Sequence, residues 1–175
     1  LIADHESVKP ENIIVGNGSN EILELAARAF LNKDASAVMS KHAFAVYKIV
    51  TKACGSEIIE VPAKDWKHDL DGFPSATKEN TRVCFIANPN NPTGTWLDHA
   101  ELETFIASVP KHIVVVLDEA YCEYLQPETA FDSMQWLAHF PNLIITRTFS
   151  KAYGLAGLRV GYAVSQPAVA DLLNR

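Results

Sequence analysis

The sequence predicts an α/β domain with three layers, in which helices cover both faces of a mainly parallel sheet of about seven strands. Short apolar runs alternate with segments of helical periodicity along the 175 residues. Several of these runs are β-branched and apolar on both faces, as expected for parallel strands buried between two helical layers. The length fits one domain, or a large part of one.

Seven apolar runs are predicted to form the strands: residues 13–15, 37–39, 57–61, 83–87, 113–117, 143–146 and 159–163. Between and after them, the residue pattern predicts helices at residues 20–31, 44–53, 98–108 and 167–174. Pro167 starts the last of these, at a first helical position that favours proline. Ligands of such sheets gather at the carboxyl ends of the strands, so functional residues are expected just after them.

Composition excludes several classes of protein. The net charge of -6 argues against a nucleic-acid partner, which requires a basic stripe. No apolar run has the length of a membrane span, and the start LIADHESVKP lacks the layout of a signal peptide. Because that start also lacks methionine, we expect a segment of a longer protein. The six histidines show no ligand-like spacing, so no metal site is expected.

The three cysteines, Cys54, Cys84 and Cys122, lie far apart in apolar neighbourhoods. This pattern predicts buried, reduced thiols and fits a cytoplasmic protein.

The first candidate motif, GNGSNE, lies between the first strand and the first helix. Gly16 and Gly18 allow a backbone to approach an anion closely, and Ser19 adds a hydroxyl donor at the positive end of the helix dipole. The alternative is a plain helix cap formed by Ser19 or Asn20. The motif also resembles a dinucleotide fingerprint, but Glu21 replaces its third glycine, so a Rossmann domain is disfavoured.

Two further motifs follow predicted strands. NPNNPTG, at residues 88–94, is a rigid loop that either makes a structural turn or holds Asn91 toward a ligand. In DEAY, Asp118 and Glu119 end an apolar strand, where buried carboxylates need partners. Helix capping, a structural ion pair, and metal or acid–base work are the alternatives for this pair. A third interpretation is that Asp118 faces a cationic ring nitrogen, whose protonated form it would favour.

The last motif is TRTFSKAYGLAGLRVG. Lys151 follows a strand and lies beside small residues and hydroxyls, which argues against a solvated surface lysine. A lysine amine whose pKa is lowered by its surroundings can act as a nucleophile toward a carbonyl. Arg159 either forms an ion pair or binds a phosphate dianion through its guanidinium fork. Together with the motifs above, these residues describe a site for a phosphorylated, protonated heteroaromatic aldehyde, which is pyridoxal 5′-phosphate (PLP).

On these four motifs the sequence resembles the fold-type-I PLP-dependent aminotransferases, and within them the histidinol-phosphate aminotransferases. The resemblance covers essentially all of the chain. It implies amino transfer between histidinol phosphate and 2-oxoglutarate in histidine biosynthesis, with Lys151 forming the aldimine and then moving the proton between substrate and cofactor. Asp118 would pair with the pyridine nitrogen, while Asn91 and Tyr121 would hydrogen-bond the ring hydroxyl.

The resemblance also implies a phosphate site and a stacking residue. The residues expected to hold the phosphate are Gly18, Ser19, Asn20, Ser150 and Arg159, with support from Thr148. Phe44 occupies the position of an aromatic that stacks on the pyridine ring; its alternative role is that of a core residue.

Members of this family are about twice as long as this chain. The resemblance therefore identifies residues 1–175 as a segment of the cofactor-binding large domain, without the N-terminal arm and the C-terminal small domain. It places the arginine that binds the substrate carboxylate in the absent part, and it implies a homodimer with the site at the subunit interface. On this interpretation the segment alone supplies most of the cofactor site and little substrate recognition.

Three other functions stay open. Threonine-phosphate decarboxylase has motifs similar to GLR and NPNNPTG, and another class-II aminotransferase, with aromatic or broad specificity, is a further alternative. A non-catalytic, ligand-sensing domain of a transcription regulator is an alternative of another class, although no basic helix-turn-helix segment is visible.

Overall fold

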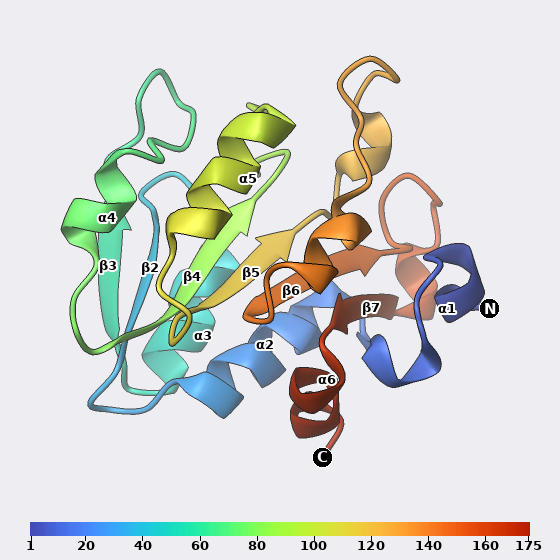
Figure 1. Cartoon of the computed structure of the whole chain (residues 1–175), viewed down its shortest axis with the longest axis horizontal. Helices are drawn as coiled ribbons and strands as arrows, with labels where there is room; N and C mark the ends of the chain where they lie inside the picture. Colours follow the sequence, from blue (N-terminus) through green and yellow to red (C-terminus); the bar gives the residue numbers. More distant parts are fainter.

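The computed structural model describes residues 1–175, and its strands form one seven-stranded sheet in the order β1-β7-β6-β5-β4-β2-β3 (Figure 1). The strands are β1 (Ile13–Asn17), β2 (Ser36–Ser40), β3 (Glu57–Val61), β4 (Thr81–Ala87), β5 (Val114–Asp118), β6 (Leu143–Thr148) and β7 (Val160–Ser165). Neighbouring strands from β3 to β6 are parallel, whereas β7 is antiparallel to both β6 and β1. The predicted seven-stranded, mainly parallel sheet is therefore confirmed, with one reversed strand.

Helices cover both faces of the sheet, as predicted (Figure 1). They are α1 (Ile2–His5), α2 (Ser19–Phe30), α3 (Ala45–Ala53), α4 (Gly72–Ala76), α5 (His99–Ser108) and α6 (Pro167–Leu173). One apolar cluster joins α4 and α5 to the sheet, and a second joins α2, α3 and α6 to its opposite face. In β2, Val38 belongs to the first cluster while Ala37 and Met39 belong to the second, because successive side chains of a strand point to opposite faces.

The predicted elements end within one or two residues of the observed ones. The prediction that a strand begins at Arg159 is wrong: Arg159 has a left-handed backbone with φ of 53°, ends the short 3₁₀ helix Ala156–Leu158, and so precedes β7. Short elements such as α1 and α4 were not predicted, because four or five residues are too few to display a helical period.

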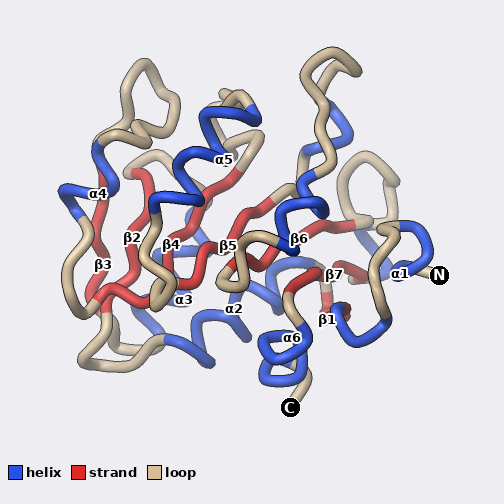
Figure 2. Tube along the Cα trace, in the orientation of Figure 1, coloured by secondary structure: helices blue, strands red, loops and turns tan.

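Connections between these elements include a loop that projects away from the sheet after the 3₁₀ helix Cys122–Tyr124 (Figure 2). The prediction of three buried thiols holds for Cys84 alone. Cys54 ends α3 and Cys122 begins that 3₁₀ helix, and both are only partly buried, since element ends lie near the surface. None of the helices combines the length and the apolar character needed to span a bilayer.

Gly161 of β7 lies against the start of α2. A Cβ atom at this position would lie 2.3 Å from the backbone nitrogen of Ser19 and 2.5 Å from the carbonyl carbon of Gly18. Both are backbone atoms, so relief requires movement of the strand or the helix.

We therefore expect Gly161→Ala to lower the free energy of unfolding by about 1–3 kcal/mol, as forced overpacking does. Urea unfolding of both proteins measures the change. Gly157→Ala is the matched control, because a Cβ there meets no atom within 4 Å. Equal stability of the two variants would contradict the tight contact.

Candidate active site

The candidate side chains meet at the carboxyl ends of the parallel strands. Asn91 follows β4, Asp118 ends β5 and Lys151 follows β6. All three line one pocket; its full lining is Ser19, Asn20, Phe44, Ala87, Pro89, Asn91, Asp118, Ala120, Tyr121 and Lys151. Neighbouring parallel strands bring their carboxyl ends to one edge, so residues far apart in sequence converge there.

Asp118 is a buried carboxylate with three hydrogen-bond donors. Its side chain is 5% exposed. The Tyr47 hydroxyl donates to Oδ2 at 2.7 Å, while the Thr146 hydroxyl and the Ala120 N–H donate to Oδ1 at 3.1 and 3.2 Å. Burial raises the pKa of Asp118, and the three hydrogen bonds and the charge of Lys151 oppose that rise.

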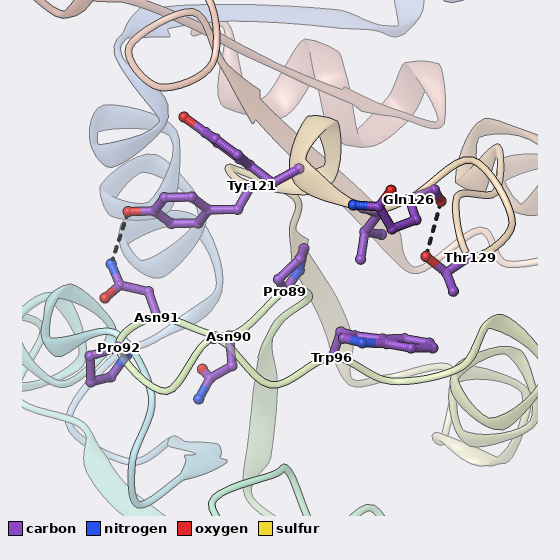
Figure 3. A pocket seen from close by; sticks show the side chains of 11 residues that line it. Pro89, Asn90, Asn91, Pro92, Trp96, Tyr121, Gln126 and Thr129 are labelled. Atoms are coloured by element: carbon purple, nitrogen blue, oxygen red, sulfur yellow. Dashed lines mark hydrogen bonds between the residues drawn. The ribbon is translucent and has the colours of Figure 1, made fainter.

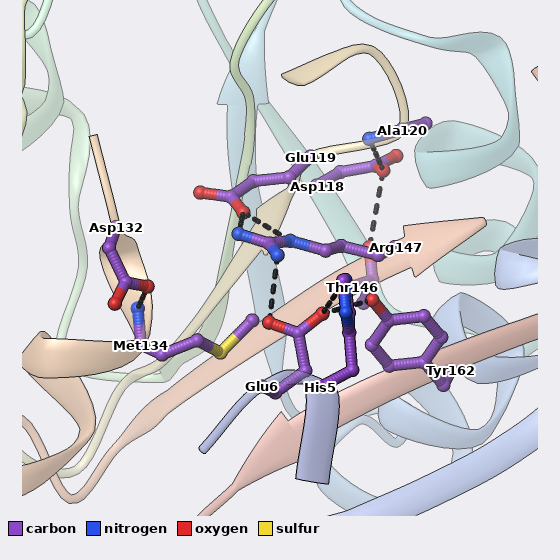
Figure 4. Close-up of polar contacts among 10 residues, drawn as sticks. All are labelled: His5, Glu6, Asp118, Glu119, Ala120, Asp132, Met134, Thr146, Arg147 and Tyr162. Atoms are coloured by element: carbon purple, nitrogen blue, oxygen red, sulfur yellow. Dashed lines mark hydrogen bonds and ion pairs between the residues drawn. The ribbon is translucent and has the colours of Figure 1, made fainter. Parts of the chain in front are cut away.

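Glu119, the next residue, belongs to a separate cluster of charges (Figure 4). Arg147 donates to Glu119 Oε2 from Nε, and its Nη2 lies 2.9 Å from the same oxygen; Arg147 Nη1 donates to Glu6 Oε2 at 2.8 Å. The Tyr162 hydroxyl donates to the other oxygen of Glu6. Of the alternatives for the DEAY carboxylates, the structural ion pair therefore describes Glu119.

The NPNNPTG loop divides its asparagines between two tasks. Asn88 and Asn90 are buried and bind backbone atoms: Asn88 pairs with Leu97, and Asn90 donates to the His42 carbonyl. Asn91 instead faces the pocket, where its Nδ2 donates to the Tyr121 hydroxyl at 3.4 Å. The loop is thus a structural turn that also presents Asn91.

A second pocket lies beside the first and shares Pro89, Asn91 and Tyr121 with it (Figure 3). Trp96 and Gln126 are among its other lining residues. The Asn91–Tyr121 pair therefore forms a wall common to both cavities.

The start of α2 forms a cup of hydrogen-bond donors. Its N-cap is Gly18, which has φ of 74° and contributes no side chain, so neither Ser19 nor Asn20 caps the helix. The cap interpretation of these two residues is therefore wrong. The first N–H groups of a helix have no partner within the helix and carry its positive dipole end, which suits an anion.

Arg159 lies across this helix start. Its guanidinium donates to the Asn17 carbonyl at 3.3 Å, and a Cβ at Gly18 would approach Nη2 to 2.5 Å. Nη1 of Arg159 lies 3.5 Å from the Ser150 hydroxyl oxygen. Arg159, Ser150 and the first turn of α2 thus meet although they come from separate segments.

The remaining predicted residues occupy different surroundings. Phe44 lines the pocket and meets Tyr47 edge to face, with ring centroids 5.7 Å apart. Thr148 is buried, and its hydroxyl oxygen accepts a hydrogen bond from the Ser150 N–H at 3.1 Å. Thr148 therefore stabilises the turn that carries Ser150.

Lys151 is exposed, contrary to the prediction against a solvated lysine. Its Nζ lies 5.3 Å from the centre of the Tyr121 ring. Residues 152–159 are exposed as well, so this segment does not shield the amine. Lys151 is a solvated lysine that nevertheless lines the pocket.

Sequence reasoning missed Tyr47 and Thr146 as partners of Asp118. Tyr47 lies three residues after Phe44, a spacing that puts both side chains on one face of a helix. That spacing is a signal that could have identified it.

Comparison with known proteins places the chain in a family. A profile described as "Aminotransferase class I and II" matches residues 2–175. The chain belongs to this family.

The relatives are named for one activity. The chain is 56% identical over 175 residues to histidinol-phosphate aminotransferase 2 of Pseudomonas fluorescens, covering 100% of this chain and 47% of the relative. It is 58% identical over 168 residues to histidinol-phosphate aminotransferase of Methylobacillus flagellatus, covering 96% of this chain and 45% of the relative. The chain thus spans about half the length of the relatives that it matches.

A solved structure has the same fold. Histidinol-phosphate aminotransferase of Sinorhizobium meliloti, in complex with pyridoxal-5′-phosphate, matches with a TM-score of 0.91 and 36% identity. The match covers 97% of this chain and 46% of that one.

The burial of Asp118 predicts a pH dependence of stability. Because its folded pKa is raised, the folded chain binds more protons than the unfolded chain at pH values above 3.8 and up to that raised pKa. This residue's contribution to the free energy of unfolding therefore falls as the pH rises through that window.

Asp118→Asn removes this titration. We expect the difference in unfolding free energy, variant minus wild type, to increase with pH across the same window, as measured by urea unfolding at a series of pH values. A difference that stays constant or decreases would contradict a raised pKa.

Proposed function

We propose that the protein is a PLP-dependent aminotransferase that moves an amino group between histidinol phosphate and 2-oxoglutarate in histidine biosynthesis. The observation that carries this proposal is one pocket lined by Lys151, Asp118, Asn91 and Tyr121. The substrate is supported by the names of relatives that are 51–58% identical. Because the chain spans about half of them, the activity is proposed for the whole protein.

The residues at hand fit PLP in their charges and in their hydrogen-bonding groups. Lys151 supplies an amine and Asp118 a buried acid to one pocket, which Phe44 also lines. The helix start carries a glycine at 18, where a Cβ would collide with Arg159. A backbone cradle without side chains and beside a guanidinium suits a phosphate dianion.

When bound, PLP supplies an aldehyde that accepts an amino group and a ring that takes up the electron pair released at the substrate Cα. Lys151 Nζ would hold the aldehyde end and carry a proton to and from the substrate Cα. Asp118 would accept a hydrogen bond from the ring nitrogen and keep that nitrogen protonated. Asn91 Nδ2 and the Tyr121 hydroxyl would bind the ring hydroxyl.

The remaining side chains bind and orient. Phe44, which lines the pocket, would pack against the ring. Thr148 holds the turn of Ser150 through its hydroxyl oxygen. The phosphate is bound by the backbone of Gly18 and by Ser19, Asn20, Ser150 and Arg159.

The proposal extends to organisation and location. Residues 1–175 correspond to the large, cofactor-binding domain, and the substrate-carboxylate arginine lies in another part of the protein. We further propose a homodimer in the cytoplasm, on the resemblance to the family.

Incubating the purified whole protein with histidinol phosphate and 2-oxoglutarate tests the reaction. We expect glutamate to form, as followed by a coupled glutamate assay, and no CO₂ to be released from O-phosphothreonine. Release of CO₂ without glutamate formation would establish the decarboxylase instead.

Lys151 is expected to be the point of covalent attachment of PLP. After addition of PLP and reduction with borohydride, mass spectrometry of peptides should find the cofactor on Lys151, and Lys151→Ala should lose the label. Lys111→Ala is the matched control, since Lys111 Nζ also lies over an aromatic ring, 5.1 Å from the centre of Phe140. Equal labelling of Lys151→Ala and wild type would refute the assignment.

A further inference from the structure

Tyr47 is a buried tyrosine whose hydroxyl makes one side-chain hydrogen bond. Its ring is 0% exposed and stacks on Phe85 with centroids 4.9 Å apart and planes at 5°. The Phe44 ring packs edge to face against the Tyr47 ring. The hydroxyl reaches from α3 to Asp118 Oδ2 at 2.7 Å, across 71 positions of sequence.

The direction of this hydrogen bond is settled by charge. Burial raises the pKa of Tyr47 well above its ordinary value, and the nearby charge of Asp118 raises it further. The phenol therefore stays neutral and donates a hydrogen bond to the carboxylate. A donor of this kind favours the ionised form of an acid.

Counting acceptor positions leaves one lone pair on Asp118. A carboxylate offers about four positions, two on each oxygen. Oδ1 uses both for the Thr146 hydroxyl and the Ala120 N–H, and Oδ2 uses one for Tyr47. One position on Oδ2 remains, on a residue that lines the pocket.

Among the groups around Asp118, the Tyr47 hydroxyl is the neutral group that does most to lower its pKa. Lys151 contributes a positive charge from the turn after β6, and Thr146 a hydroxyl from β6 itself. Tyr121, from the segment after β5, interacts electrostatically with the Tyr47 phenol. Only Tyr47 donates to the oxygen that keeps a free lone pair.

We propose that Tyr47 is a positioning residue that orients Asp118 Oδ2 and keeps it ionised, so that its remaining lone pair accepts a hydrogen bond from a protonated ring nitrogen in the pocket. Tyr47 touches neither the cofactor nor the substrate in this role and acts only through Asp118. The identity of the ring rests on the proposed function; the coupling between Tyr47 and Asp118 does not.

Tyr47→Phe tests the coupling, because phenylalanine keeps the stack on Phe85 and removes only the hydroxyl. Tyr162→Phe is the matched control: Tyr162 is also a buried tyrosine that donates to a buried carboxylate, that of Glu6. Neither variant creates a cavity larger than one oxygen atom.

The first measurement uses the whole protein without cofactor. Carboxyl resonances of ¹³C-labelled aspartate are titrated by NMR, and Asp118→Asn assigns the signal of Asp118. We expect a higher pKa of Asp118 in Tyr47→Phe than in wild type, and no change in Tyr162→Phe. An unchanged Asp118 titration in Tyr47→Phe would overturn the proposal.

The second measurement compares the affinity of PLP with that of its 1-deaza analogue, in which carbon replaces the ring nitrogen. Loss of a hydrogen bond to a charged group predicts about tenfold weaker binding of PLP to Tyr47→Phe. The analogue should bind Tyr47→Phe and wild type equally. Equal weakening of both ligands would mean that Tyr47 acts through packing alone.

The two measurements test different claims, so one can be refuted while the other stands. If the wild-type whole protein binds no PLP, the proposed function and the identity of the ring are both refuted. The NMR titration still decides whether Tyr47 controls the ionisation of Asp118.

Discussion

Satisfying the buried charge of Asp118 is the constraint on which the rest of the pocket depends. An ionised carboxylate at the end of a buried strand is costly unless donors surround it. The donors come from three places, α3, β6 and the backbone after β5, so these segments must meet at one point. That meeting brings Phe44, three residues before Tyr47, to the same cavity as Lys151. The hydrogen bonds that a buried Asp118 requires thus help to bring together the segments that line the pocket.

Asp118 and Glu119 show how one strand end serves two purposes. Successive side chains of a strand point to opposite faces, so adjacent acids enter different surroundings. Glu119 pairs with Arg147, which also binds Glu6, the residue after α1, and so ties the first residues of the chain to the sheet. Removing one partner of such a buried pair leaves an uncompensated charge, which is strongly destabilising. This cluster stabilises the scaffold, while Asp118 keeps an acceptor position free for a ligand.

The sequence was sufficient for the sheet and for the grouping of Asn91, Asp118 and Lys151, because parallel strands carry whatever follows them to the same edge. It was insufficient for contacts whose partners lie far apart, such as Tyr47 with Asp118, since no local pattern encodes them. The reversal of β7 was missed for a similar reason: an apolar run does not reveal its direction. The exposure of Lys151 depends on what packs around the turn, which local composition does not determine.

The surroundings of Asp118 and the start of α2 favour charged ligand groups for different physical reasons. Around Asp118, burial strengthens each hydrogen bond and discriminates between charged and neutral partners. At the start of α2, Asn20 and Arg159 are exposed, and an anion bound there would rely on free N–H groups and a guanidinium. A phosphate is strongly anionic and gains from such donors without full desolvation, whereas a protonated ring nitrogen needs the buried acid. A ligand that carries both an anionic group and a cationic nitrogen therefore suits the combination of donors and buried acid around this pocket.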